Sequence, residues 1–160
     1  MAMFSKTDGH SQAGVALVEF ALVVPLLALL LVGIIEIGRY AYFSIAVANA
    51  ARAGAQYGAY DTARAVDVVG MQNAAIADGQ NNIKAITAAA NDVCTCWNST
   101  TGTESPSPPA HTQCGQPCAS GVPVTYVEVD TSGNFSSMFS YPLFPRTFAV
   151  SAKAIMRVHP

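Results

Sequence analysis

The sequence carries little charge. Asp, Glu, Lys and Arg make up 11% of its 160 residues, whereas soluble domains average about 25%. The formal net charge is −2 and the cations form no cluster, so the basic surface that nucleic-acid binding requires is missing. We therefore exclude nucleic acid as a partner.

Recognisable catalytic groupings are missing as well. The three histidines, His10, His111 and His159, are far apart in the sequence. It contains no Ser, His and acid grouping, no phosphate-binding glycine loop and no cluster with the spacing of metal ligands, and active sites are recognised from such constellations. We expect neither enzymatic activity nor a cofactor, a metal or a small-molecule substrate.

What the sequence does contain is one long apolar run, GVALVEFALVVPLLALLLVGII, from Gly14 to Ile35. A helix needs about 20 apolar residues to cross the hydrocarbon core of a bilayer. The run is followed by charged and aromatic residues of the kind found at a membrane surface: Glu36, Arg39, Tyr40, Tyr42 and Phe43. We therefore predict a transmembrane helix, with Glu36 and Arg39 able to pair across three residues.

Glu19 is the only charged residue within this run. An acid inside a membrane costs several kcal/mol at mid-bilayer, so such acids usually have a partner or a function. If the chain were cut after Gly14, the new ammonium of Val15 would lie one helical turn before Glu19, on the same face. The alternative is that Glu19 lies close enough to the headgroups to stay hydrated.

The same residues resemble a known processing site. Gly14, followed after four residues by Glu19 and Phe20, resembles the site at which prepilin peptidase cuts prepilins and pseudopilins. More narrowly, VEFALVVPLLALLLVGIIEIGRYAY and ANAARAGAQYGA, within residues 14–60, resemble the TadE-like family of the tight-adherence (Flp-type) pilus system. The resemblance implies cleavage between Gly14 and Val15, and a role for Glu19 and Phe20 in assembly and subunit register.

Two signals disagree about the topology. Lys6 precedes the run while Arg39 and Arg52 follow it, and the positive-inside rule alone would place the carboxyl-terminal part in the cytoplasm. The resemblance implies the opposite, because prepilins are cut on the cytoplasmic face. The four cysteines, all in the second half of the chain, also suit an oxidising compartment. We expect a single-pass bacterial inner-membrane protein with a cytoplasmic amino terminus and a periplasmic domain; an extracellular pilus is a second expected location.

Beyond the span, no proline interrupts the chain between Tyr40 and Tyr60, so we predict that the helix continues to about Tyr60. Small residues recur along this part: Ala51, Gly54, Ala55 and Gly58. A face of small residues allows another backbone to approach closely, which predicts helix packing. The simpler alternative is that alanine is an excellent helix former and needs no partner.

Further along, two helical segments and three strands are predicted. Asp61 to Ala77 is expected to form a helix with Asp61 as its N-cap and a stripe of Ala65, Val68, Val69, Gln72 and Ile76. Ile83 to Asn91 is expected to form a short helical piece. Extended or alternating patterns predict strands over 93–97, 122–130 and 147–158. A turn at Gly133-Asn134 and an irregular connector over 140–145 complete the prediction.

The cysteines bracket a loop rich in Ser, Thr, Pro and Gly, predicted over 98–121. Cys94 and Cys96 lie on one side of it and Cys114 and Cys118 on the other. We expect two disulfides that cross the loop, although three pairings of four cysteines are possible. A zinc site is the alternative, but these spacings depart from the usual C-x2-C pair.

Together these patterns predict a pilin-like α+β fold in which a long transmembrane helix continues into a small domain with short helices and an antiparallel sheet of about three strands. We expect a leader over 1–14, a transmembrane helix over 15–38, a helical region over 39–92 and a sheet domain over 93–160. The resemblance implies a pseudopilin or minor pilin-like subunit in pilus assembly. Its expected partners are the inner membrane, prepilin peptidase, other pilins or pseudopilins and assembly-platform proteins. The alternative is a membrane-anchored binding or adhesion module that never enters a filament.

Overall fold

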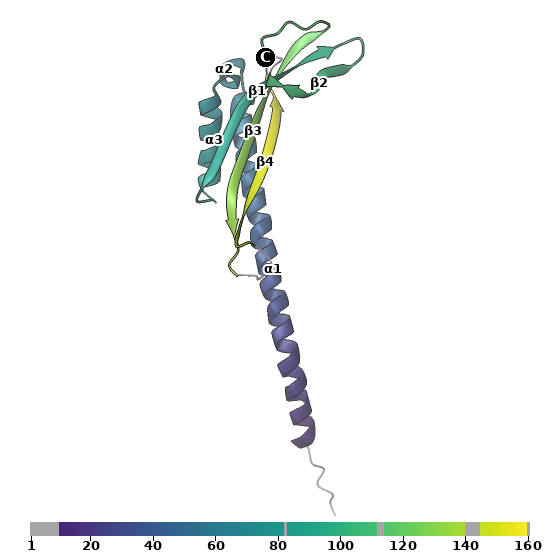
Figure 1. The fold of residues 1–160 in the computed structure, drawn as a ribbon, viewed down its shortest axis with the longest axis vertical. Coiled ribbons are helices and arrows are strands. Elements are labelled where there is room, and N and C mark those ends of the chain that lie inside the picture. The colour runs from purple at the N-terminus through teal and green to yellow at the C-terminus, as the bar shows by residue number, and fades with distance from the viewer. Residues whose placement is uncertain (1–9, 82, 112–113, 140–144, 160) are drawn as a thin grey trace, which may run out of the picture. The chain divides into compact units, whose positions relative to one another are not determined.

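The computed structural model describes residues 10–81, 83–111, 114–139 and 145–159 (Figure 1). The chain divides into two compact units, Met1–Arg39 and Tyr40–Pro160. The elements follow in the order α1 (His10–Ala59), α2 (Thr62–Ala65), α3 (Val68–Gln80), β1 (Ile86–Asn98), β2 (Thr103–Ala110), β3 (Val122–Ser136) and β4 (Thr147–Arg157). The fold is α+β, as the sequence predicts.

The longest element is α1, a helix of 50 residues. It continues through Pro25, although proline lacks a backbone donor and is unfavourable inside a helix. The predicted end near Tyr60 is confirmed, since α1 ends at Ala59. Its residues up to Arg39 belong to the first unit, and those from Tyr40 onward belong to the second.

The described residues contain a sheet of four antiparallel strands in the order β2-β1-β3-β4, so the prediction of about three was wrong. The additional strand is β2, inside the segment predicted as a loop. Its sequence, TESPSPPA, contains three prolines, which argue against a strand in the interior of a sheet. Because β2 lies at the sheet edge, one side of its backbone needs no ladder donor and proline is tolerated.

The helical prediction for Ile83 to Asn91 was also wrong, because β1 begins at Ile86. Its alanines favour a helix intrinsically. The segment nevertheless pairs with β3 from Ile86 opposite Gly133 to Trp97 opposite Val122, and this long ladder outweighs the local preference. The alanines have a packing role in the strand: Ala90 is buried in the core.

The turn predicted at Gly133-Asn134 is absent, since both residues lie inside β3 and pair with Val150 and Ala149 of β4. Glycine serves a different purpose at this position. A Cβ at Gly133 would lie 3.1 Å from Cζ of Phe43, so the missing side chain allows α1 to approach the strand. The connector predicted over 140–145 lies, apart from Pro145, outside the described residues.

The helix predicted from Asp61 to Ala77 is two helices. Asp61 caps α2 as predicted, its side chain accepting a hydrogen bond from the backbone N–H of Arg64, but the helix ends at Ala65. Asp67 then caps α3. The restart shifts the buried stripe to Met71, Ala75 and Gly79, so Val69, predicted on the buried face, is exposed.

The core of the second unit lies between the sheet and the helices that cover one of its faces, α3 and the part of α1 from Tyr40 onward (Figure 1). Val127 and Val129 of β3 meet Met71 of α3 and Ala55 of α1 in one cluster. A second cluster includes Val47, Ala50, Ile86, Phe135 and Val150. The buried Thr131 hydroxyl donates a hydrogen bond of 2.8 Å to the carbonyl of Val47, which ties β3 to α1.

Candidate functional site

The first candidate site is the apolar segment of α1. Its large side chains from Val15 to Ile35 are exposed, with Leu22 at 72%, except that of Val32, which is half-buried. In the part of the chain that the structure describes, α1 is the only helix long and apolar enough to cross a membrane. Exposing apolar area to water costs roughly 25 cal/mol per Å², so this segment requires a membrane or other apolar helices around it.

Glu19 and the predicted cleavage site lie at the beginning of this segment. Gly14, Val15, Glu19 and Phe20 are all exposed on α1. Glu19 has no hydrogen-bond or ion-pair partner among the described residues. The Gly14–Val15 peptide lies inside the helix, and a peptidase that needs an extended substrate would have to unwind the first turns locally. The structure thus leaves Glu19 available to a group outside the described chain.

The end of the segment carries the predicted ion pair. Arg39 donates a hydrogen bond of 2.9 Å to Glu36, which confirms the pairing. Tyr42 is exposed. Tyr40, also predicted as a membrane-surface residue, has a second role in the folded unit because its ring packs against Phe135 and Phe148, each with ring centroids 5.6 Å away.

The predicted packing residues Ala51, Gly54, Ala55 and Gly58 are all buried. Their neighbours belong to the same chain. A Cβ at Gly54 would lie 2.8 Å from the carbonyl oxygen of Met71 and 3.0 Å from Cβ of Ala75. A Cβ at Gly58 would collide with the Met71 side chain. The small face therefore accommodates α3, which explains why glycines interrupt an alanine-rich helix.

The second candidate site is the disulfide-bonded loop. Cys94 is joined to Cys114 and Cys96 to Cys118, so both bonds cross the loop as expected. Cys94 and Cys96 are two residues apart in one strand and project from the same face, toward the returning chain. A hollow of about 300 Å³ beside them is lined by uncharged residues: Cys96, Asn98, Thr103, Ser105, Pro117, Ala119 and Ser120. Trp97, the residue after Cys96, is 37% exposed.

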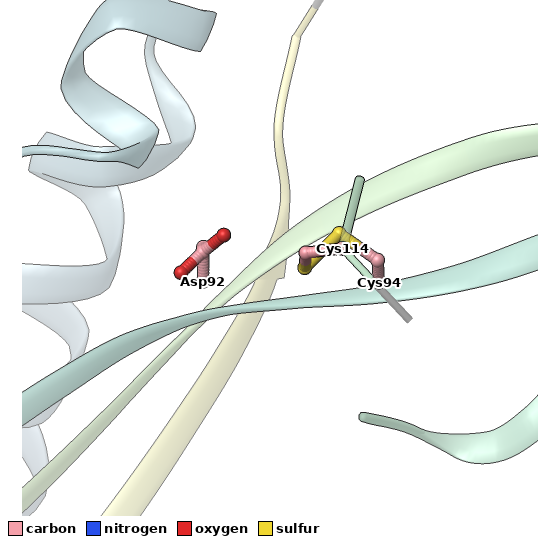
Figure 2. A group of neighbouring side chains, drawn as sticks. All are labelled: Asp92, Cys94 and Cys114. Carbon is pink, nitrogen blue, oxygen red and sulfur yellow. A yellow bond between two sulfur atoms is a disulfide. The ribbon is translucent and has the colours of Figure 1, made fainter. Parts of the chain in front are cut away.

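One group of side chains resembles a metal site at first sight. Asp92 lies beside Cys94 and Cys114 with potential ligand atoms within 4.8 Å of one another (Figure 2). His111 is close as well, with Nδ1 3.1 Å from Oδ1 of Asp92. The two sulfur atoms are bonded to each other, however, and metals bind the thiolate form. In this disulfide state the group is a structural staple.

These features can be compared with known proteins. Residues 14–56 match the family model of the TadE-like proteins. The match confirms the resemblance predicted from the sequence. No curated protein and no solved structure is significantly similar to the chain.

The TadE-like segment contains Gly14, Glu19, the Glu36–Arg39 pair and most of the small-residue face. It ends within α1, so α2, α3, the sheet and the disulfides lie outside it. Sequence reasoning overlooked the contacts that Tyr40 makes with the sheet. No local pattern could reveal them, because Phe135 and Phe148 follow about a hundred residues later.

Proposed function

We propose that the chain is a pseudopilin-like structural subunit that takes part in assembling a tight-adherence (Flp-type) type IV pilus. The observation that carries this proposal is the TadE-like match over a helix whose apolar side chains are exposed. A helix of this kind is suited to insertion in a membrane or packing among similar helices. Gly14 and Glu19 stand at its beginning with the spacing of a prepilin processing site.

Processing would give Glu19 its partner. Cleavage after Gly14 leaves an ammonium on Val15, four residues before the carboxylate, and groups at this spacing face each other on a helix. In a filament the same carboxylate can pair with the ammonium of a neighbouring subunit. That intermolecular pair would set the axial register between subunits, with Phe20 beside it, and would lower the cost of holding an acid in an apolar layer.

We further propose a single-pass topology. Residues 1–14 form the leader in the cytoplasm, residues 15–38 span the inner membrane, and the second unit is periplasmic. The two disulfides support this orientation, because such bonds persist in the periplasm and are rare in the cytoplasm. Prepilin peptidase, other pilins or pseudopilins and the assembly-platform proteins are the partners that follow from this placement.

The amino terminus of the mature protein tests the proposal. In host cells with active prepilin peptidase, intact-mass spectrometry should find a chain that begins at Val15. The leader should remain in cells without the peptidase and in a Gly14→Leu variant. Gly38→Leu is the matched control, because a side chain at Gly38 also meets open space on α1, and this variant should be processed normally. Retention of the leader in the natural protein, or cleavage at another bond, would contradict the proposal.

A second candidate function is a membrane-anchored binding or adhesion module. The observation that favours it is the disulfide-bonded loop, which lies outside the TadE-like segment. If this function is the real one, deleting the loop should abolish binding while Glu19→Ala has little effect. The pseudopilin function predicts the reverse dependence on Glu19.

A further inference from the structure

In the second unit, the end of β3 and the start of β4 pack against the beginning of α1. Phe135 near the end of β3 and Phe148 near the start of β4 have ring centroids 5.2 Å apart. Tyr40 packs on both rings, and Phe43 packs edge-on against Phe135 at 5.6 Å. Aromatic pairs of this geometry attract one another beyond the effect of their buried area. The cluster therefore fixes this end of the sheet beside Tyr40.

Apolar side chains are exposed directly after the end of β3. Met138 is 59% exposed and Phe139 is 43% exposed. A local turn holds the backbone at this point: the Ser137 hydroxyl donates to the carbonyl of Phe139 and accepts from its N–H, and the Ser137 N–H donates to the carbonyl of Arg146. Phe148, which packs on Phe135 in the aromatic cluster, is exposed too. We call Met138, Phe139 and Phe148 the hairpin patch.

One cation accompanies the hairpin patch. Arg146 is exposed, and its backbone carbonyl accepts a hydrogen bond from the Ser137 N–H, next to Met138. Lys153 lies further along β4 and is paired with Glu128 and Asp130 of β3. Apolar and aromatic side chains with an accompanying cation are typical of surfaces that rest in the interfacial layer of a membrane with anionic headgroups.

We propose that the hairpin patch is a second membrane contact, seated in the headgroup layer of the membrane that holds the apolar segment of α1. This inference rests on the membrane anchoring in the proposed function. Chain continuity indicates which surface covers the patch, because Tyr40 directly follows Arg39 at the end of the apolar segment. A lipid surface at Arg39 is within one residue of Tyr40, the ring on which Phe135 and Phe148 pack.

The contact has a consequence for the disulfide-bonded loop. In the ladders of β3, Ser136 pairs at the hairpin end, whereas Val122 pairs with Trp97 at the other end. The 15 residues of β3 span about 50 Å at roughly 3.3 Å per residue. With the hairpin patch on the membrane, the sheet stands with its disulfide-bonded end directed away from the lipid.

Tryptophan fluorescence in vesicles tests the proposal, since the chain contains one tryptophan, Trp97, at the far end of β1. The full chain, with Trp97→Phe and Phe139→Trp, is reconstituted in vesicles of phosphatidylethanolamine and phosphatidylglycerol. Bromine atoms near the headgroup end of the acyl chains should quench the introduced tryptophan about twofold or more, because interfacial side chains lie about 5–10 Å into this boundary. The natural protein, with Trp97 alone, and a Val122→Trp, Trp97→Phe variant are controls that should show little quenching.

The outcomes separate the two proposals. If the chain floats with the vesicles but the tryptophan of the Phe139→Trp variant is quenched no more than Trp97, the second contact is wrong and the anchor stands. If the chain does not float with the vesicles, both are wrong. A blue shift of the variant's emission that grows with protein concentration, without bromine quenching, would assign the hairpin patch to a second copy and overturn the lipid contact. Met138→Trp repeats the measurement at a neighbouring exposed position, so that a folding defect of one variant does not decide the result.

Discussion

At the scale of single residues, the glycines of α1 separate two roles that look alike in the sequence. Gly33 and Gly38 have open space where a side chain would be, whereas Gly54 and Gly58 face Met71 and β3. The sequence predicts a close approach at Gly54 and Gly58, but the identity of the partner depends on α3, whose phase is set by the cap at Asp67. Intrinsic propensity could not supply that phase.

Gly54→Ala should therefore destabilise the second unit. Alanine is a better helix former than glycine by about 1 kcal/mol, but the new Cβ would lie 2.8 Å from the Met71 carbonyl, and overpacking of a core costs about 1–3 kcal/mol. We expect a net loss of about 1 kcal/mol in the free energy of unfolding, measured by denaturant titration of the detergent-solubilised chain. Gln56→Ala, on the exposed side of the same helix, is the control and should be neutral or slightly stabilising. A stabilised Gly54→Ala protein would show that α3 does not pack closely on α1.

The cap of α3 makes stability depend on pH. The Asp67 carboxylate accepts hydrogen bonds from the Gly70 N–H and from the Tyr57 hydroxyl. Both bonds hold the pKa of Asp67 below its ordinary value, and the bond from Gly70 has the larger effect. A carboxyl group with a lowered pKa in the folded state contributes stability above its unfolded pKa of about 4, and this is lost as the pH falls through the folded pKa. The same hydrogen bond to Asp67 raises the pKa of Tyr57, so its contribution is present below about pH 10 and is lost above it.

Asp67→Asn should weaken the pH dependence of stability on both the acid and the alkaline side. Asparagine still caps a helix well, so α3 should persist near neutral pH with a modest loss of stability. The measurement is the midpoint of thermal unfolding by circular dichroism between about pH 2 and 11, a range chosen to bracket both ordinary pKa values. Asp78→Asn, at another exposed acid of α3, is the control and should keep the natural acid limb. If the unfolding midpoint of Asp67→Asn falls at low pH as much as that of the natural protein, Asp67 is not the group responsible for the acid dependence.

At the scale of elements, the sequence predicts strands well where side chains alternate and poorly where composition favours another structure. The alternation over 147–158 corresponds to β4, and Val122 to Asp130 lies within β3. The alanines at the start of β1 and the prolines of β2 give misleading signals, because a long ladder and an edge position override them. The predicted disulfides across the loop imply that the chain returns beside β1. They do not predict that the returning segment forms a strand, β2.

Removing one disulfide should loosen β2 without unfolding the sheet. The Cys94–Cys114 bond closes a separation of 20 residues, and such a loop is stabilised by roughly 3 kcal/mol in the chain-entropy model. In the double variant Cys94→Ser, Cys114→Ser, limited proteolysis should cut within residues 98–121 faster than in the natural protein. The β1, β3 and β4 segments should stay protected. The natural protein with both disulfides reduced should be cut in the loop faster still. If the loop is equally protected in the natural, double-variant and reduced proteins, the disulfides do not order it.

At the scale of the whole molecule, the two units give different kinds of information. The first unit has a family match and an exposed apolar helix but few internal contacts of its own to interpret. The second unit has a packed core, disulfides and a defined sheet, and the family match ends inside its first helix. The family resemblance could therefore be predicted from the sequence of residues 14–56. The architecture of the second unit could be described only from the structure.

Glu19 connects the anchor to the proposed assembly of the pilus. Glu19→Ala removes a charge from an apolar segment, which lowers the cost of membrane insertion, so the amount of protein in the membrane should not fall. If the carboxylate pairs with the ammonium of a neighbouring subunit, assembled pili should fall about tenfold or more, corresponding to a lost coupling of about 1.4 kcal/mol. Pilus output is measured by shearing and immunoblotting against membrane content. Glu36→Gln, at the acid that pairs with Arg39 within the chain, is the control and should have a small effect. Equal output from Glu19→Ala and natural protein would remove the register role of Glu19 and favour the binding module.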